Sequence, residues 1–137
     1  MATSRIPRGI RNKNPGNIER NSTRWKGMAA SQTDSRFLVF KHEIWGIRAM
    51  ARILLVNYRA GRRSIAEIIS RWAPGTENNT KSYIEFVGKT LGVDPYKPCD
   101  IPKLLPQLIP AIIRRENGIQ PYSEEVIEIG IELEGSV

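Results

Sequence analysis

The chain has 137 residues, of which 40% are hydrophobic and 26% are charged. These fractions are typical of a globular protein and exclude wholesale disorder, and the length predicts a single domain. Lysine and arginine number 21 against 14 acidic residues, and the resulting formal charge of +7 implies an anionic partner. Because Cys99 is the only cysteine and His42 the only histidine, the sequence excludes an internal disulfide and a Cys/His zinc cluster.

No glycine-rich phosphate loop, nucleophile elbow or calcium loop is present, and we therefore expect neither a metal nor a cofactor. No apolar run approaches the roughly 18 residues of a membrane span, and the basic N-terminus has no signal-peptide core. We therefore expect synthesis in a cytoplasm and no membrane span.

Residues 1–36 are predicted to form a basic, loop-rich segment, and residues 37–137 a mostly helical body. The Asn14–Asn17 stretch predicts a turn, because proline fixes φ while glycine and asparagine tolerate positive φ. A disordered tail is the alternative for this segment. The apolar run Phe37–Phe40 then predicts a small strand.

Apolar residues recur at three- and four-residue steps after Glu43, which predicts helices with one buried face. Ser64 and Glu67 form a capping-box pattern at the second of these helices. The fourth helical region contains Pro106 and Pro110, so the sequence is compatible with one kinked helix and with two short helices. The predicted helices cover about 43–61, 64–74, 76–92, 102–117 and 123–133. The sequence thus predicts a mainly α protein, formed by a single domain with a small N-terminal β element.

Four stretches carry a resemblance to a family of bacteriophage virion proteins that are often labelled only as structural proteins. They include Arg-Asn-x-Asn-Pro-Gly-Asn-Ile, Trp-x-Gly, Gly-Ile-Arg-Ala and Ile-Ile-x-Arg-Trp-Ala-Pro. They lie within residues 11–18, 25–27, 37–49 and 68–83, and the resemblance covers most of the chain. It departs from the family pattern at Glu19, Gly75 and Pro106. The resemblance implies a virion protein with other tail or capsid proteins as partners.

The N-terminal stretches also look like part of the lysozyme-like glucosaminidase family. That resemblance implies a lysozyme-like helical domain whose catalytic glutamate ends a helix upstream of these stretches, in the pattern Ala-x-x-x-x-Glu-Ser/Asn-Gly. No acid precedes Glu19 here, but Ala111–Gly118 fits the pattern and places Glu116 at the acid position. We therefore hypothesise a circularly permuted lysozyme-like domain.

Cleavage of a glycosidic bond requires a carboxylic acid that protonates the leaving oxygen, and Glu116 is the candidate for this catalytic role. Its simpler interpretation is an exposed residue at a helix end. Glu43 and Glu19 are candidates for a second carboxylate. Their simpler interpretations are a first-turn helix acid for Glu43 and, for Glu19, a loop residue paired with a neighbouring arginine.

Aromatic side chains offer flat faces to sugar rings, and asparagines offer amide donors and acceptors. Trp25 lies in the basic segment and is the preferred stacking residue, whereas Tyr83 and Trp72 are expected on buried helix faces. Turn formation and helix capping explain the asparagines equally well. The substrate-binding candidates are Asn14, Asn17, Trp25, Asn78, Tyr83 and Tyr122.

The leading hypothesis is a phage virion or tail-associated enzyme, of the lysozyme or lytic transglycosylase type, that cleaves the glycan strand of peptidoglycan. It would be made in the host cytoplasm, be carried in the virion and act in the bacterial periplasm or cell wall. The first alternative is a non-catalytic virion structural protein. A DNA-binding protein ranks last, because arginines cluster around the second predicted helix but no recognition helix stands out, and nucleic acid is not the expected partner.

Overall fold

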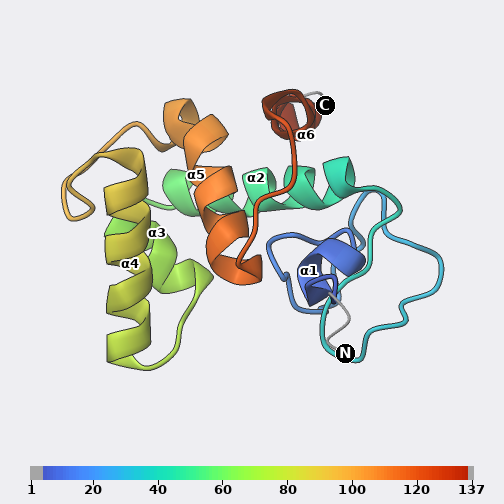
Figure 1. The fold of residues 1–137 in the computed structure, drawn as a ribbon. Coiled ribbons are helices and arrows are strands. Elements are labelled where there is room, and N and C mark those ends of the chain that lie inside the picture. Colours follow the sequence, from blue (N-terminus) through green and yellow to red (C-terminus); the bar gives the residue numbers. More distant parts are fainter. Residues whose placement is uncertain (1–4, 136–137) are drawn as a thin grey trace.

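Helix α2 runs through the middle of the molecule, and the other elements are arranged around it (Figure 1). This computed structural model describes residues 5–135, and residues 1–4 of the predicted basic segment and residues 136–137 lie outside the described part. The described part contains six helices, which confirms the prediction of a mainly α protein. Their bounds are α1 Arg8–Arg11, α2 Glu43–Arg59, α3 Ile65–Trp72, α4 Glu77–Leu91, α5 Ile101–Asn117 and α6 Glu124–Gly135. None of them is long and apolar enough to cross a membrane.

The buried face of α2 forms the centre of the hydrophobic core and packs against α3, α5 and α6. Helix α6 comes closest at Gly130, because a Cβ atom at that position would lie 2.4 Å from Cγ2 of Ile47. The largest fully buried side chains are Leu38, Phe40, Ile47, Met50, Leu54, Ile65, Ile68, Ile69, Ile101, Leu105, Leu108 and Ile109.

Side-chain caps explain where most of the helices begin, as α3, α2 and α5 illustrate. The Oγ atom of Ser64 accepts a hydrogen bond from the N–H of Glu67 at 3.1 Å, and the Glu67 carboxylate accepts one from the N–H of Arg63 at 3.3 Å. The predicted Ser64–Glu67 pair thus caps α3, although the carboxylate bonds the N–H of Arg63 and not that of the N-cap residue Ser64. His42 caps α2 through Nδ1, and Asp100 caps α5 through its carboxylate.

Helix α5 is continuous although it contains Pro106 and Pro110. Each proline lacks the N–H that would bond the carbonyl four residues earlier, which is why the sequence left two short helices open. Pro106 is exposed and Pro110 is half-buried, whereas Leu105, Ile109 and Ile112 on the inner face are buried. Burial of the inner face therefore outweighs the hydrogen bonds that the prolines remove.

The predicted β element was wrong, because the Phe37–Phe40 run does not form a strand. Between residues 5 and 135 the structure contains only isolated bridges, two of which pair Phe37 with Glu19 and Phe40 with Met28. The physical reason is that the run shares its hydrogen bonds among separate segments. The N–H of Leu38 donates to the carbonyl of Ile18 and that of Phe40 to the carbonyl of Asn12, each at 3.0 Å, so no single ladder extends.

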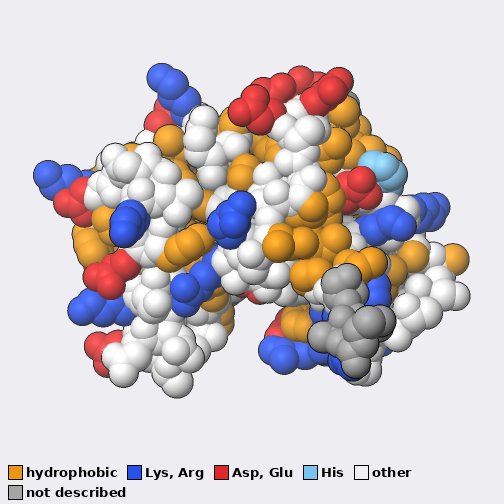
Figure 2. All heavy atoms as spheres, in the orientation of Figure 1, with side chains coloured by type: hydrophobic (Ala, Val, Ile, Leu, Met, Phe, Trp, Pro, Cys, Tyr) orange, Lys and Arg blue, Asp and Glu red, His pale blue; other side chains and the backbone are white. Residues whose placement is uncertain are grey.

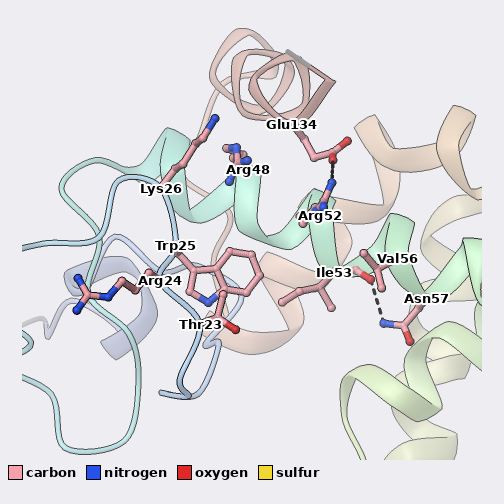
Figure 3. Close-up of a pocket in the computed structure, with 10 residues that line it drawn as sticks. All are labelled: Thr23, Arg24, Trp25, Lys26, Arg48, Arg52, Ile53, Val56, Asn57 and Glu134. Atoms are coloured by element: carbon pink, nitrogen blue, oxygen red, sulfur yellow. Dashed lines mark hydrogen bonds and ion pairs between the residues drawn. The ribbon is translucent and has the colours of Figure 1, made fainter. Parts of the chain in front are cut away.

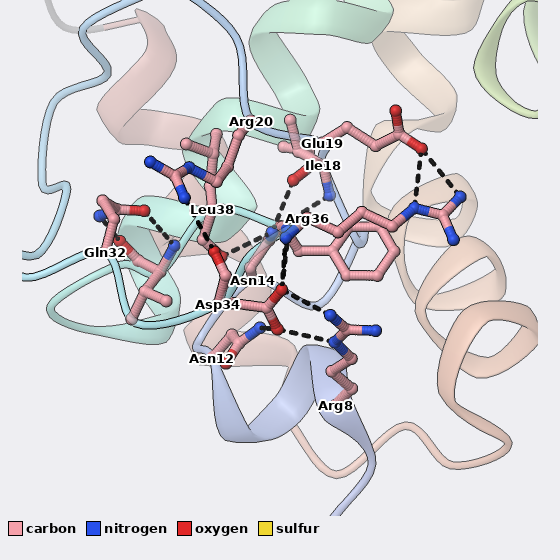
Figure 4. A network of polar contacts seen from close by, with 12 residues as sticks. Arg8, Asn12, Asn14, Ile18, Glu19, Arg20, Gln32, Asp34, Arg36 and Leu38 are labelled. Carbon is pink, nitrogen blue, oxygen red and sulfur yellow. Dashed lines mark hydrogen bonds and ion pairs between the residues drawn. The ribbon is translucent and has the colours of Figure 1, made fainter.

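The buried carboxylate of Asp34 organises the basic N-terminal segment (Figure 4). Its side chain is 7% exposed and accepts two hydrogen bonds from the Arg8 guanidinium, each 2.6 Å long, and one from the amide of Asn12 at 2.9 Å. The backbone N–H groups of Arg36 and Phe37 also donate to it, at 2.8 and 2.9 Å. The bonds from Arg8, followed by the backbone donors and Asn12, hold the pKa of Asp34 well below its usual range.

Gly46 brings α2 into contact with the N-terminal turn. A Cβ atom at Gly46 would lie 2.3 Å from the carbonyl oxygen of Lys13 and 2.9 Å from Cδ of Pro15. Since the first of these neighbours is backbone, a side chain at position 46 would push the turn away from the helix. Two of the stretches that carry the virion-family resemblance, 11–18 and 37–49, therefore contact one another here.

We expect Asp34→Asn to lower the melting temperature at neutral pH and to reduce the loss of stability in acid. Because the pKa of Asp34 is lower in the folded chain, its stabilisation is fully present above the unfolded pKa of about 4. It is lost as the pH falls below that value toward the folded pKa. Thermal unfolding between pH 7 and pH 2 measures both effects. Glu19→Gln is the control, because Glu19 and Arg36 form an ion pair whose side chains are both 63% exposed. Identical acid sensitivity in Asp34→Asn and the wild type would contradict the expectation.

Gly46→Ala is expected to destabilise the fold by about 1–3 kcal/mol, because the added methyl group meets backbone. Gly75→Ala is the matched control, since a Cβ atom there would find nothing within 4 Å. Its free energy of unfolding should stay within about 0.5 kcal/mol of the wild type. Urea unfolding of the wild type, Gly46→Ala and Gly75→Ala measures these free energies. Equal values for all three would contradict the expectation and show that the N-terminal turn can move away from α2 at no cost.

Candidate functional site

A cleft of about 780 Å³ lies where the N-terminal segment, α2, the end of α3 and the end of α5 meet. Its walls are drawn from residues 16–21, 36–37, 53–57 and 71–74 together with Glu116. We call it the Glu116 cleft. It brings the N-terminal turn and the end of α5 together, as the sequence hypothesis required.

Glu116 lies in the last turn of α5, half-buried, with both carboxylate oxygens engaged. Oε1 accepts a hydrogen bond from Nδ2 of Asn17 at 3.1 Å, and Oε2 accepts one from the hydroxyl of Tyr83 at 3.0 Å. The two donors come from the N-terminal turn and from α4. The carboxylate is thereby held in one orientation at the wall of the cleft.

Asn17 reaches Glu116 because the turn before it is held against α5. Its own φ is +51°, in the left-handed region that the Asn-Pro-Gly-Asn pattern favours. The Asn117 amide donates to the carbonyl of Pro15 at 2.8 Å and so ties the turn to the helix that carries the acid. Gly9 of α1 packs beneath both asparagines, since a Cβ atom there would lie 2.6 Å from Oδ1 of Asn117 and 2.7 Å from Oδ1 of Asn17.

Tyr83 lies on a buried helix face, as its helical spacing predicted, and not in the open position that sugar stacking would need. Its side chain lies on the inner face of α4 and the residue is only 6% exposed, so its ring has no open face for a ligand. Burial, together with the charge of Glu116 and the hydrogen bond to it, raises the pKa of Tyr83 well above its usual range. The hydroxyl therefore remains a hydrogen-bond donor to Glu116 at every physiological pH.

Asn14 was predicted to bind substrate, and the structure corrects this, because the side chain is fully buried. Its amide nitrogen donates to the carbonyls of Ile18 at 3.0 Å and Leu38 at 2.9 Å, and its oxygen accepts from the N–H of Ile18 at 3.0 Å. Both amide hydrogens are used inside the N-terminal segment (Figure 4). Asn14 therefore builds the turn and does not reach the cleft.

Three other candidates lie outside the Glu116 cleft. Asn78 is exposed in the first turn of α4, where Thr76 supplies the cap. Glu43 opens α2, and its carboxylate lies 3.7 Å from Nδ1 of His42. Tyr122 is close enough to Glu43 to be affected by its charge: burial, and after it Glu43, raises the pKa of Tyr122 to about 12. The structure thus groups Glu43 with Tyr122 and brings neither to Glu116.

Trp25 lines a neighbouring pocket of about 470 Å³, which we call the Trp25 pocket (Figure 3). The Glu116 cleft and the Trp25 pocket are both lined by Ile53, Val56 and Asn57 of α2. The two hollows therefore adjoin one another along the same helix.

Sequence reasoning missed Trp72 and Arg71 as residues of the cleft. The helical spacing placed Trp72 on a buried face, but it is half-buried and lines the cleft beside Arg71. The N-terminal turn comes very close to the tryptophan, because a Cβ atom at Gly16 would lie 2.9 Å from its Cζ2 atom. The Arg-Trp-Ala-Pro stretch, one of those that carry the virion-family resemblance, was the available signal.

Within the described part of the chain, the cleft offers one carboxylate that forms no ion pair, that of Glu116, flanked by amides and aromatic rings. Its other acid, Glu19, is bonded to the guanidinium of Arg36 at 2.9 Å. Among residues 5–135 no group of three or more histidines, cysteines and acids is arranged to hold a metal ion. This set of side chains can exchange a proton with a polar ligand through Glu116.

Comparison with known proteins places the chain among phage proteins. No protein-family model matches it. The chain is 41% identical over 131 residues to "Protein P5" of Pseudoalteromonas phage PM2, in an alignment that covers 91% of this chain and 80% of that protein. The chain belongs to the family of this phage protein. The resemblance to a family of phage proteins that the sequence indicated is thereby confirmed.

Proposed function

We propose that this phage protein is a virion-associated enzyme that cleaves the glycan strand of peptidoglycan, with Glu116 as its catalytic acid. The observation that carries the proposal is the Glu116 carboxylate, held by Asn17 and Tyr83 at the wall of a cleft of about 780 Å³. That volume lies in the range of typical ligand sites. Membership of a phage family supports the virion as a place where the protein works, and action at the host cell wall is part of the proposal.

In the proposed reaction the protonated Glu116 transfers its proton to the oxygen of the glycosidic bond as the bond to the sugar carbon breaks. Negative charge then develops on the Glu116 carboxylate. The amide of Asn17 and the hydroxyl of Tyr83 already point at its two oxygens and stabilise this charge without reorganisation. Their contribution is larger in the transition state than in the ground state, which is the condition for catalysis.

A single acid is sufficient for this chemistry. Glu19 shares the cleft but is bonded to Arg36, and Glu43 lies outside it. The nucleophile is then water or a group of the substrate itself, and the Glu116 carboxylate takes up the proton that the nucleophile releases. This assignment favours lytic transglycosylation or substrate-assisted hydrolysis over a covalent enzyme intermediate.

The proposed fold is a permuted lysozyme-like domain. In this arrangement the acid-bearing helix, α5, follows the N-terminal stretches in the chain and returns to them in space. The hydrogen bond between Asn17 and Glu116, 99 residues apart, is the contact that such a permutation requires.

The second candidate function is a structural virion protein without catalysis. It is favoured by the segregated charge of the surface, where acidic side chains gather over α6 although the chain as a whole is basic (Figure 2). Glu124, Glu125 and Glu128 are all exposed there, beside the exposed Ile129. A face of this kind suits contact with a basic neighbouring subunit.

Glu116→Gln is expected to slow the clearing of purified Gram-negative peptidoglycan by at least about 100-fold, because it removes the proton donor. The turbidity of a sacculus suspension measures the rate. Glu19→Gln and Glu43→Gln are matched controls, and both variants should keep most of the clearing rate of the wild type. Absence of clearing by the wild type would leave the structural role, and full activity of Glu116→Gln would remove this residue from the mechanism.

Tyr83→Phe is expected to lower kcat by about 10-fold or more with little change in KM, since it deletes one bond to a charged group that forms in the transition state. Tyr96→Phe, at a tyrosine that is 58% exposed, is the control. An increase in KM at constant kcat would instead indicate that Tyr83 contacts the substrate directly.

A further inference from the structure

The Trp25 pocket continues the Glu116 cleft along α2. Ile53, Val56 and Asn57 line both, and Val56 is 50% exposed although it is apolar. The amide of Asn57 donates to the carbonyl of Ile53 at 2.9 Å, which fixes the shared wall (Figure 3). A polymer bound at Glu116 can therefore extend into the Trp25 pocket without leaving the surface of this helix.

The Trp25 pocket carries an excess of positive charge among its described residues. Four cations line it, and its one acid, Glu134, is paired with Arg52 at 3.2 Å. Within residues 5–135 no carboxylate forms an ion pair with Lys26 or Arg48. Figure 3 shows both side chains on the α6 side of the pocket, whereas Arg24 points away from it.

Two buried hydrogen-bond donors in this pocket also lack an acceptor. They are Nε1 of Trp25 and Nε of Arg48, for which residues 5–135 supply no partner. A buried donor without a partner is costly and uncommon in folded proteins. Trp25 and Arg48 therefore belong to a part of the lining whose polar groups the described chain leaves unsatisfied.

The chemistry of the lining indicates the class of ligand. The indole of Trp25 and the apolar side chains of Ile53 and Val56 suit the C–H face of a sugar ring. Lys26 and Arg48 suit a carboxylate attached to that ring. Peptidoglycan combines the two, because alternate sugars carry a lactyl-peptide substituent with free carboxyl groups, whereas neutral glycans do not.

We propose that the Trp25 pocket is a second subsite, in which Lys26 and Arg48 bind an acidic substituent of the glycan strand while Trp25 contacts the sugar. The inference rests on the proposed function, because it assigns the substrate class of the same groove. It makes the protein selective for glycans that carry carboxylates.

Binding to sacculi, measured without turnover, tests the subsite. The full-length Glu116→Gln protein is incubated with purified sacculi, either native or with their carboxyl groups amidated, and the bound fraction is determined by cosedimentation. Adding Arg48→Gln should weaken binding to native sacculi by about 10-fold or more, as expected for the loss of a bond to a charged partner. Amidated sacculi should bind both proteins equally weakly.

Arg59→Gln is the matched control, because Arg59 is an exposed arginine of the same helix that lines neither hollow. It removes the same charge, so a general electrostatic attraction would weaken Arg48→Gln and Arg59→Gln alike, and that result would overturn the proposal. Lys26→Gln provides a second variant at an exposed side chain, which keeps the test valid if Arg48→Gln unfolds.

The outcomes separate the subsite from the enzyme. Binding that depends on Arg48 and on the carboxylates of the substrate supports the subsite, whether or not the wild type clears peptidoglycan. Absence of clearing by the wild type would overturn only the proposed function. Conversely, an active wild type whose binding is unaffected by Arg48→Gln and Lys26→Gln overturns the subsite alone. In a competition experiment, a single-stranded oligonucleotide and soluble peptidoglycan fragments are each used to release the protein from sacculi. If the oligonucleotide released the protein at a lower concentration than the fragments, the pocket would be a nucleic-acid surface and the proposal would be overturned.

Discussion

The hydrogen bonds of the Glu116 carboxylate connect three parts of the chain that are far apart in sequence. Asn17 and Tyr83 lie 99 and 33 residues from Glu116, and their donor groups meet its two oxygens at 3.1 and 3.0 Å. A half-buried carboxylate requires such partners, because removing a charge from water is costly unless it is hydrogen-bonded. The cleft, its acid and the position of α4 and α5 relative to the N-terminal turn therefore depend on one another.

The N-terminal segment achieves this precision with little regular secondary structure. Buried polar side chains replace the hydrogen-bond ladders of a sheet: Asp34 collects five donors, and the Asn14 amide bonds to two carbonyls and an N–H group. Catalytic and binding residues are commonly carried on loops that a rigid scaffold positions. In this protein the loop itself is made rigid, and that is what allows Asn17 to serve as a fixed partner of the acid.

Periodicity and capping residues were sufficient to locate the five longer helices, whereas the four-residue helix α1 lies in the segment that was predicted to be loop-rich. The Ser64–Glu67 capping box and the apolar spacing after Glu43 correspond to observed helices. The prediction of a strand at Phe37–Phe40 was wrong. The backbone of this run bonds to three separate segments, and the local sequence does not indicate which segments these are. The same limit applied to the site. The pattern around Glu116 suggested an acid, but the burial of Asn14, the hydroxyl contact of Tyr83 and the only partial burial of Trp72 follow from tertiary packing alone.

The distance along the chain between Asn17 and Glu116 also bears on biosynthesis. Contacts around Asp34 are formed within the first 37 residues, so the N-terminal segment can organise early while the ribosome is still translating the message. The carboxylate comes from α5, which emerges only after α2, α3 and α4 have been made. Contacts of such long sequence separation form late, because the intervening chain must be ordered first. An incomplete nascent polypeptide that ends before α5 consequently has the residues of the N-terminal turn but not Glu116, and the contact between them requires α5 to have been made.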